Sequence, residues 1–309
     1  MRNKALVVGS VAYDVVFSVH NNFKEEVIVE EGKVKDLSMM LTAENKQVFF
    51  GGTAGNIAYG LGIQGTSPLM FSVVGDDLNN DYRAHLESNG VNIKAKVFQG
   101  EHTASFYAIS DVEKDQIGIF QPNTHGDYMG STNLSEMLIN EDFEKIKIAI
   151  FSPGTGESIR NHMEELREKS GVESLVIFDP SQVLSIFFDE KLTMECIELS
   201  DIFIGNETEI DQLKKLLNTD LKNILNFGLK YIIETKGKDG AITHTHDGEK
   251  FIPSTSPKTF AEQTGAGDAF RAGLIKGLLS DMKIEDACKV GSLMGAKNVE
   301  ALGGQNYKL

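Results

Sequence analysis

The sequence contains little cysteine, proline or basic charge, and it has no tryptophan. Its two cysteines are Cys196 and Cys288, and only six prolines occur among 309 residues. Neither cysteine has a second cysteine or a histidine at metal-ligand spacing, so we expect buried, reduced thiols rather than a disulfide or a cysteine-based metal site. The scarcity of proline, together with 41% apolar residues, excludes a disordered or collagen-like chain.

Long hydrophobic runs are also missing. The apolar stretch at residues 5–8 ends at Gly9, which is too short for the core of a signal peptide or for a membrane span. We therefore expect a cytoplasmic protein with no membrane partner.

Basic residues are outnumbered 30 to 45 by acidic ones, which gives a net charge of −15. A surface of that sign repels polyanions, so nucleic acid is not an expected partner. Free ATP is not excluded, because a few backbone amides, one cation and Mg²⁺ can hold a triphosphate inside an acidic protein.

Short β-branched runs alternate with helical periodicity along most of the chain. The expected strands are residues 5–10, 69–74, 146–152, 175–179, 202–205 and 231–235. The expected helices include 80–89, 158–170 and 207–217. This alternation predicts an α/β fold with a mostly parallel central sheet.

Two regions break the alternation and are expected to form a small β-lid. Residues 15–50 start with alternating apolar positions and then lack a helical pattern, while 94–98, 103–110 and 116–120 are typical of successive antiparallel strands. The prediction is a large domain of residues 1–13, 52–93 and 125–309, and a lid of residues 14–51 and 94–124. Lid edge strands can pair between two copies, so a homodimer through the lid is a candidate assembly.

The segment Thr264-Gly265-Ala266-Gly267-Asp268 precedes an apolar helical run. Glycines at a helix start let phosphate oxygens approach free amides at the positive end of the helix dipole. Asp268 would repel such an anion unless it accepts a proton from an attacking hydroxyl, which makes it a candidate general base. The alternative is a tight turn with Asp268 as the helix N-cap, and these residues alone do not decide between the two.

A second glycine pair, Gly51 and Gly52, also precedes an expected helix, and Asn56 lies one turn into it. Such a site suits the close approach of a hydroxylated ligand. Asp14 follows the first expected strand, at the edge where open α/β sheets present ligand-binding side chains, and one carboxylate can accept two sugar hydroxyls. Packing glycines and a solvated loop aspartate are the plainer alternatives.

With two further motifs, these segments resemble the PfkB or ribokinase family of carbohydrate and nucleoside kinases over essentially the whole chain. Residues 206–209 resemble the family's N-x-x-E motif, and residues 235–240 resemble its T-x-G-x-x-G nucleotide loop. The details are most similar to the bacterial adenosine kinase branch in segments 9–14, 50–59, 267–273, 293–296 and 304–306.

The resemblance implies a ribokinase-like three-layer α/β/α sandwich with a β-sheet lid. It also implies transfer of the γ-phosphate of ATP, with Mg²⁺, to a primary hydroxyl of a nucleoside or sugar. The adenosine 5′-OH is the favoured acceptor. The implied catalytic residues are Asp268, Gly265, Ala266 and Gly267. The implied acceptor site contains Asp14, Gly51, Gly52 and Asn56, with Tyr107 and Phe120 of the lid sandwiching the base. The implied nucleotide site contains Asn206, Thr235, Gly237, Gly240 and Thr264, with Glu209 organising Mg²⁺ through water.

One departure from the family and four alternative interpretations are considered. Glu262 and Gln263 stand where the family usually has an Asp-Thr pair that helps many members hold a monovalent cation, so potassium activation is not expected here. Ordinary strand packing is the plainer interpretation of Tyr107 and Phe120. A ribose- or fructose-type sugar kinase would use the same motifs, and a catalytically silent nucleotide or metabolite sensor could keep the fold. A dinucleotide-binding dehydrogenase is disfavoured, because no G-x-G-x-x-G follows the first strand.

Overall fold

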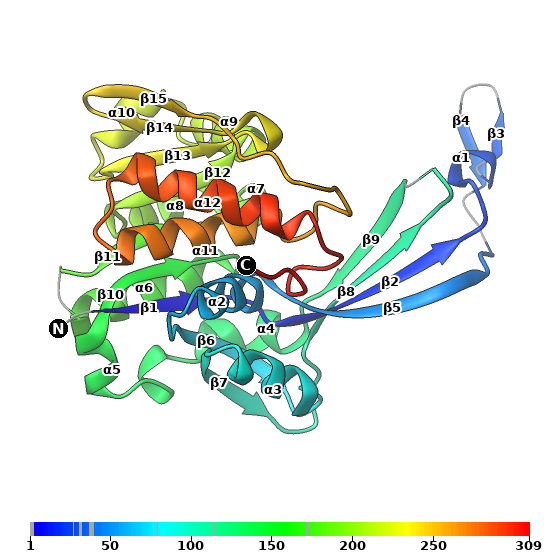
Figure 1. Ribbon diagram of the computed structural model, residues 1–309, viewed down its shortest axis with the longest axis horizontal. Coiled ribbons are helices and arrows are strands. Elements are labelled where there is room, and N and C mark those ends of the chain that lie inside the picture. Colours follow the sequence, from blue (N-terminus) through cyan, green and yellow to red (C-terminus); the bar gives the residue numbers. More distant parts are fainter. Residues whose placement is uncertain are drawn as a thin grey trace.

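A large α/β body and an extended sheet that projects from it make up the molecule (Figure 1). The computed structural model describes residues 3–309 except 27, 31–32, 37–39, 79, 114 and 171–172. Among the helices of these residues, none has the length and apolar character needed to cross a membrane.

The body is built around one nine-stranded sheet in the order β15-β14-β13-β12-β11-β10-β1-β6-β7. Every pairing from β7 to β13 is parallel, and β14 and β15 add an antiparallel edge. The mostly parallel sheet expected from the sequence is thus confirmed. Its strands are β1 (Lys4–Val8), β6 (Leu69–Gly75), β7 (Asn92–Phe98), β10 (Ile146–Phe151), β11 (Leu175–Phe178), β12 (Ile202–Asn206), β13 (Tyr231–Thr235), β14 (Ala241–Thr245) and β15 (Gly248–Ile252).

Helices cover both faces of this sheet, because its central strands are apolar on both sides. In β1, Ala5 and Val7 face one hydrophobic cluster, and Leu6 and Val8 face the other. The first cluster packs under α2 (Thr53–Ile63), α3 (Asn80–Ser88), α11 (Ala266–Leu279) and α12 (Ile284–Asn298). The second packs under α5 (Asn140–Lys145), α6 (Gly156–Ser170), α7 (Leu184–Phe187), α8 (Glu190–Glu198), α9 (Glu207–Leu216) and α10 (Leu221–Leu225). The result is the expected three-layer sandwich.

The projecting sheet, called the lid below, has the strand order β5-β2-β8-β9. Strand β2 is antiparallel to β5 and parallel to β8, and β9 is antiparallel to β8. Short elements lie at the far tip and where the lid joins the body (Figure 1). The lid strands are β2 (Ala12–Val19), β5 (Ala43–Gly51), β8 (Ala104–Ser110) and β9 (Gln116–Gln121). The short elements are α1 (Phe23–Glu26), β3 (Ile28–Glu30), β4 (Lys33–Asp36) and α4 (Asn123–Tyr128).

One segment assigned to the lid from the sequence, residues 94–98, belongs instead to the body. It forms most of β7, which pairs in parallel with β6 in the large sheet. The segment follows α3 after a short turn and so completes a βαβ unit, with Ala95 buried and Ile93 packed against the first cluster. The prediction of three successive antiparallel lid strands is therefore wrong for its first member.

Two histidines are buried near the lid's attachment, His125 in α4 and His162 in α6. The His125 Nε2 lies 3.0 Å from the Pro153 carbonyl oxygen, and the His162 Nε2 lies 2.8 Å from that of Thr132. Burial lowers the pKa of both rings, and that of His125 falls to about 4. Both imidazoles are therefore neutral in the folded protein at pH 7.

We expect acid to destabilise the fold through His125. The unfolded chain protonates this ring near pH 6.5 and the folded one only near pH 4, so stability is full above about pH 6.5 and declines as the pH falls towards 4. Between pH 7.5 and 5.0 the loss from this group should be about 2 kcal/mol. Urea unfolding of the wild type and of His125→Gln at both pH values measures it, with His246→Gln, an exposed histidine, as control. Equal pH dependence in all three proteins would contradict the assignment.

Candidate active site

The predicted catalytic turn is the start of α11. Its N-cap is Gly265, with a left-handed φ of 80°, and a Cβ there would lie 2.7 Å from the Gly304 Cα, so the position requires glycine. Asp268 is the third residue of the helix and makes no capping hydrogen bond, which contradicts the N-cap alternative. The Ala266 amide donates to the Gln263 carbonyl oxygen at 3.1 Å.

Two amides of this turn are therefore left to bind an anion. The Gly267 and Asp268 N–H groups have no acceptor within the described part of the chain, and Gly267 is exposed. A short stretch of exposed helix N-terminus with free amides is a favourable place for a phosphate group.

The Asp268 carboxylate lies half-buried beside α2. Its Oδ2 accepts a hydrogen bond from Asn56 Nδ2 at 2.8 Å. Burial raises the Asp268 pKa to about 6, and the positive charge of Arg271 and the Asn56 hydrogen bond limit this rise. A carboxylate with that pKa is mostly ionised at pH 7 and is basic enough to accept a proton from a bound hydroxyl.

A second carboxylate, Asp14 on β2, lies close enough to Asp268 to feel its charge. Burial raises the Asp14 pKa to about 7, and the charges of Asp268 and Glu262 add to the rise. The backbone of Gly51 passes directly beside it, since a Cβ at Gly51 would lie 2.3 Å from Asp14 Oδ2. The structure thus brings together Asp14, Gly51, Asn56 and Asp268.

The glycine pair that starts α2 is held against the loop after β1. Gly52 is the N-cap with a φ of 84°, and a Cβ there would lie 2.6 Å from the Ser10 carbonyl oxygen. That same carbonyl accepts hydrogen bonds from the amides of Ala54 and Gly55, at 3.0 and 3.3 Å. The start of α2 therefore packs against the backbone of the loop after β1, and the side chain of Asn56 extends from α2 into the site.

The C-terminal segment supplies a residue that sequence reasoning assigned no role. Gln305 is 2% exposed, and its Nε2 donates to Asn56 Oδ1 at 3.0 Å and to the Tyr82 hydroxyl at 2.8 Å. The Tyr82 hydroxyl in turn donates to the Gly51 carbonyl at 2.5 Å. Gln305 thereby fixes the Asn56 amide with its Nδ2 towards Asp268. The only signal in the sequence was the family likeness of residues 304–306.

The predicted N-x-x-E motif forms the start of α9. Asn206 is the N-cap, with Oδ1 accepting from the Glu209 amide at 3.0 Å, and Glu209 Oε2 accepts from the Asn206 amide at 2.8 Å. Glu209 Oε1 accepts from the Ser181 hydroxyl at 3.3 Å, so both oxygens of this buried carboxylate already have donors. Its pKa is raised by burial.

Mg²⁺ would fit beside this motif only through water. The residues that the structure describes contain no group of three His, Cys, Asp or Glu side chains that could hold a metal ion. Mg²⁺ typically keeps several waters and binds through one or two carboxylates and the substrate's phosphates. A buried Glu209 and an exposed Asn206 are compatible with such indirect binding.

The predicted nucleotide loop lies next to this motif. Thr235 pairs with Asn206 across β13 and β12, so both segments end at the carboxyl edge of the sheet. The loop closes through a 2.8 Å hydrogen bond from the Lys236 amide to the Gly240 carbonyl, and Gly237 and Gly240 have φ of 53° and 114°. Thr264 is exposed just before the start of α11.

The two predicted base-stacking aromatics lie on opposite faces of the lid. Phe120 pairs with Phe106, which pairs with Asp14, and paired residues share a face. Tyr107 pairs with Ile119 and so faces the other way. Tyr107 and Phe120 cannot enclose one ring, and the aromatic on the Asp14 side next to Phe120 is Phe106.

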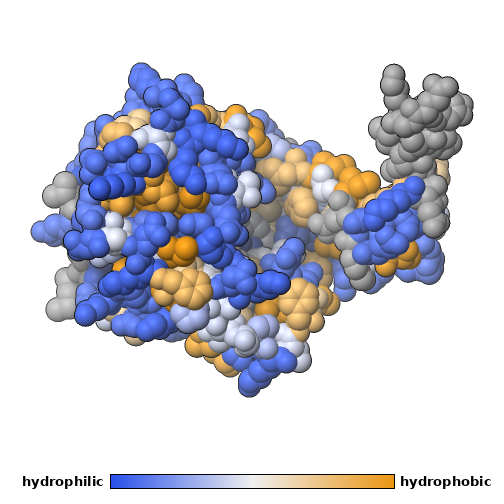
Figure 2. Space-filling view, turned by 90° about the horizontal axis from the view of Figure 1, so that it is seen from above, coloured by the Kyte–Doolittle hydropathy of each residue, from blue (hydrophilic) through white to orange (hydrophobic). Residues whose placement is uncertain are grey.

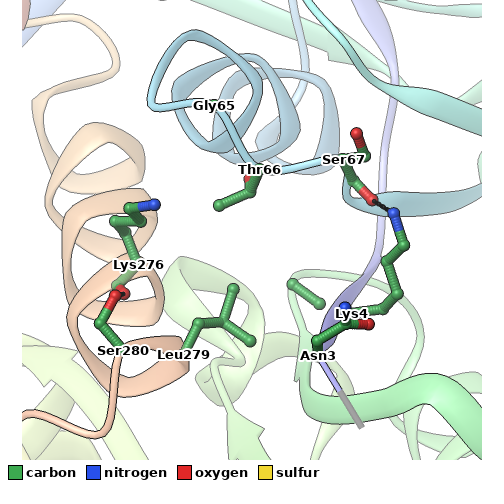
Figure 3. Close-up of a pocket in the computed structure, with 9 residues that line it drawn as sticks. Asn3, Lys4, Gly65, Thr66, Ser67, Lys276, Leu279 and Ser280 are labelled. Carbon is green, nitrogen blue, oxygen red and sulfur yellow. Dashed lines mark hydrogen bonds between the residues drawn. The ribbon is translucent and has the colours of Figure 1, made fainter. Parts of the chain in front are cut away.

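A small cavity in the described structure lies away from these residues. It measures about 310 Å³ and lies between the start of β1, the end of α2 and the end of α11, at the amino edge of the sheet (Figure 3). Lys4 and Lys276 line it, and Lys4 Nζ donates to the Ser67 carbonyl oxygen at 3.1 Å. It shares no residue with the predicted site, which occupies the opposite, carboxyl edge.

Solved structures with this ribokinase-like fold include nucleoside kinases. The Burkholderia thailandensis nucleoside kinase in complex with inosine superposes with a TM-score of 0.81 at 28% identity, covering 98% of this chain and 93% of that one. The Methanocaldococcus jannaschii nucleoside kinase gives a TM-score of 0.85 at 25% identity, covering 99% and 94%.

The pfkB family of carbohydrate kinases matches residues 2–308, and the chain belongs to this family. The M. jannaschii nucleoside kinase is 27% identical over 304 residues, which is 98% of this chain and 92% of its own. A 5-dehydro-2-deoxygluconokinase from Clostridium tetani is 24% identical over 272 residues, covering 80% and 77%. The chain is thus a kinase whose acceptor is a nucleoside or a sugar.

Proposed function

We propose that this kinase transfers the γ-phosphate of ATP to the 5′-OH of a nucleoside, with adenosine as the acceptor. The observation that carries the proposal is the position of Asp268: it adjoins the two free amides of α11 and faces Asn56 and Asp14. The similarity to nucleoside kinases over nearly the full chain supports a nucleoside acceptor.

In the proposed reaction, Asp268 accepts the proton of the acceptor hydroxyl while the hydroxyl oxygen forms a bond to the γ-phosphorus. The bond from phosphorus to the bridging oxygen breaks, and ADP leaves with that electron pair. The amides of Gly267 and Asp268 stabilise charge on the transferred group. Bound Mg²⁺ would neutralise phosphate charge, with Asn206 and Glu209 orienting its waters.

The acceptor would lie on the lid face that carries Asp14. That carboxylate would accept two sugar hydroxyls, and the base would lie against Phe106 and Phe120. The nucleotide would extend over residues 235–240. Closure of the lid would exclude water and limit hydrolysis of ATP.

The other lid face is a candidate dimer surface. Val48, Ile117 and Ile119 lie on the side of Tyr107 and are 53%, 39% and 60% exposed. Apolar side chains gather on the projecting lid in Figure 2. Pairing of two copies through this face would cover them.

Replacing the proposed base should abolish most turnover. Asp268→Asn keeps the shape of the side chain and its place next to Asn56, but it removes the proton acceptor. We therefore expect kcat to fall about 10²- to 10⁴-fold while the affinity for ATP is kept. Coupled ADP release and nucleotide titration measure the two effects, and Asp281→Asn, at an exposed position, is the control. Near-normal turnover in Asp268→Asn would show that the base is another group.

The substitution Gly51→Ala should weaken the binding of the acceptor and leave the binding of ATP unchanged. The added Cβ would overlap the Asp14 carboxylate and displace it, so KM for the acceptor should rise about 10- to 100-fold, the effect of losing a hydrogen bond to a charged group. KM for ATP should not change. The matched control is Gly130→Ala, where the nearest atom to the new Cβ is 3.7 Å away. An unchanged acceptor KM in Gly51→Ala would remove Asp14 from the acceptor site.

The acceptor itself is identified by thermal shift with adenosine, inosine, ribose and fructose, each with a non-hydrolysable ATP analogue. Nucleosides, adenosine foremost, should raise the melting temperature, because ligand that binds only the folded state stabilises it. Flat responses to both nucleosides with a response to ribose or fructose would favour the sugar-kinase alternative, which the similarity to a 5-dehydro-2-deoxygluconokinase supports. Binding without turnover would indicate a silent sensor.

A further inference from the structure

A buried ion pair ties the catalytic turn to the end of a central strand. Arg271, in α11, is 7% exposed, and Asp179, directly after β11, is 1% exposed. Arg271 Nη2 donates to Asp179 Oδ1 at 2.6 Å, and Nε donates to Oδ2. This two-point contact fixes the plane of the guanidinium, which a lysine could not reproduce.

The same guanidinium also touches the turn itself. Its Nη1 donates to the Gly267 carbonyl oxygen at 3.1 Å, and a Cβ at Gly267 would lie only 3.0 Å from that nitrogen. Arg271 therefore lies under the residue whose amide faces the proposed phosphate position. The Arg271 side chain binds the carbonyl oxygen of Gly267, while the N–H groups of Gly267 and Asp268 stay free among the described residues.

Arg271 is the cation shared by three carboxylates of the site. Although burial raises the pKa of Asp268 and of Glu209, the charge of Arg271 acts against this rise in both. Burial would lower the pKa of Arg271, but Asp179 raises it, so the guanidinium stays charged. It thus links the N-x-x-E motif on α9 to the turn on α11.

The remaining groups around Asp268 cannot replace this charge. They come from β2, α2, the end of β11, the segment before α11 and the C-terminus. They are Asp14, Asn56, Asp179 and Tyr307, with Glu262 next to Asp14. All of them are acidic or neutral at pH 7, so Arg271 is the single cation in this set.

We propose that Arg271 is a positioning residue for phosphoryl transfer: anchored by Asp179 and bonded to the Gly267 carbonyl, it holds the first turn of α11, and with it the Asp268 carboxylate, in place. The proposal rests on the base role of Asp268. It assigns Arg271 no contact with substrate, and it makes Asp179 the residue that sets how strongly Arg271 acts on Asp268.

The test uses two substitutions with opposite electrostatic effects. Arg271→Gln removes the cation, so the acid limb of the kcat/KM profile against pH should move up by about 1 unit. Asp179→Asn removes an anion that raises the Asp268 pKa, so the same limb should move down. A purely structural role would lower kcat or the melting temperature in both variants without opposite shifts.

A double variant guards against misfolding. Arg271→Gln with Asp179→Asn replaces the ion pair by a neutral pair of similar shape, which avoids leaving one buried charge alone. Because Arg271 affects the Asp268 pKa more than Asp179 does, the acid limb should still move up, but by less than in Arg271→Gln. Compared with Arg271→Gln, Arg271→Lys should bring the acid limb back towards its wild-type position, since lysine keeps the positive charge. It should not restore full kcat, since lysine cannot make the two-point contact with Asp179.

The matched control is a second arginine–aspartate pair, partly buried, that contacts the amino end of β11. Arg167 Nη2 donates to Asp201 Oδ2 at 2.9 Å, and that oxygen accepts from the Val176 amide at the start of β11. Arg167→Gln should lower stability and leave the pH profile unmoved. Unshifted limbs, or shifts in one direction for both Arg271→Gln and Asp179→Asn, would overturn the proposal. Failure of the proposed function is seen separately, as absent turnover in the wild type.

Discussion

The site depends on two half-buried carboxylates held near each other at the junction of two sheets. Asp14 lies near the start of lid strand β2 and Asp268 in the first turn of α11. The charge of Asp268 contributes to the raised pKa of Asp14. Such an arrangement opposes folding unless something offsets the repulsion. The structure offsets it with the hydrogen bond from Asn56 to Asp268 and with the positive charge of Arg271.

The glycines matter because they allow backbone to lie where side chains would otherwise be. Gly265 lets the C-terminal segment approach at Gly304, and Gly304 in turn lies against the Asn56 side chain. Gln305 can then reach Asn56 and orient it. A chain of backbone contacts and amide hydrogen bonds thus connects residues near positions 50, 265 and 305, and a polar site is formed inside an otherwise apolar sandwich.

The parallel sheet, the helix starts and the cap at Asn206 could be predicted because each has a local signal. The pairing of β7 could not, since its alternation of lysine and apolar residues also suits an exposed lid strand, and only contact with β6 decides. The choice between Phe106 and Tyr107 depends on register with β2, which no local pattern reveals. The roles of Arg271 and Gln305 have no local signal beyond the family likeness of their segments, because their partners lie 92 and 249 residues away.

The central claim is tested most directly by a crystal structure of the protein with adenosine and a non-hydrolysable ATP analogue. The 5′-oxygen should lie within about 2.6–3.2 Å of an Asp268 carboxylate oxygen, with the terminal phosphate at the Gly267 and Asp268 amides. A nucleoside whose 5′-oxygen is remote from Asp268, or a terminal phosphate bound away from the start of α11, would contradict it.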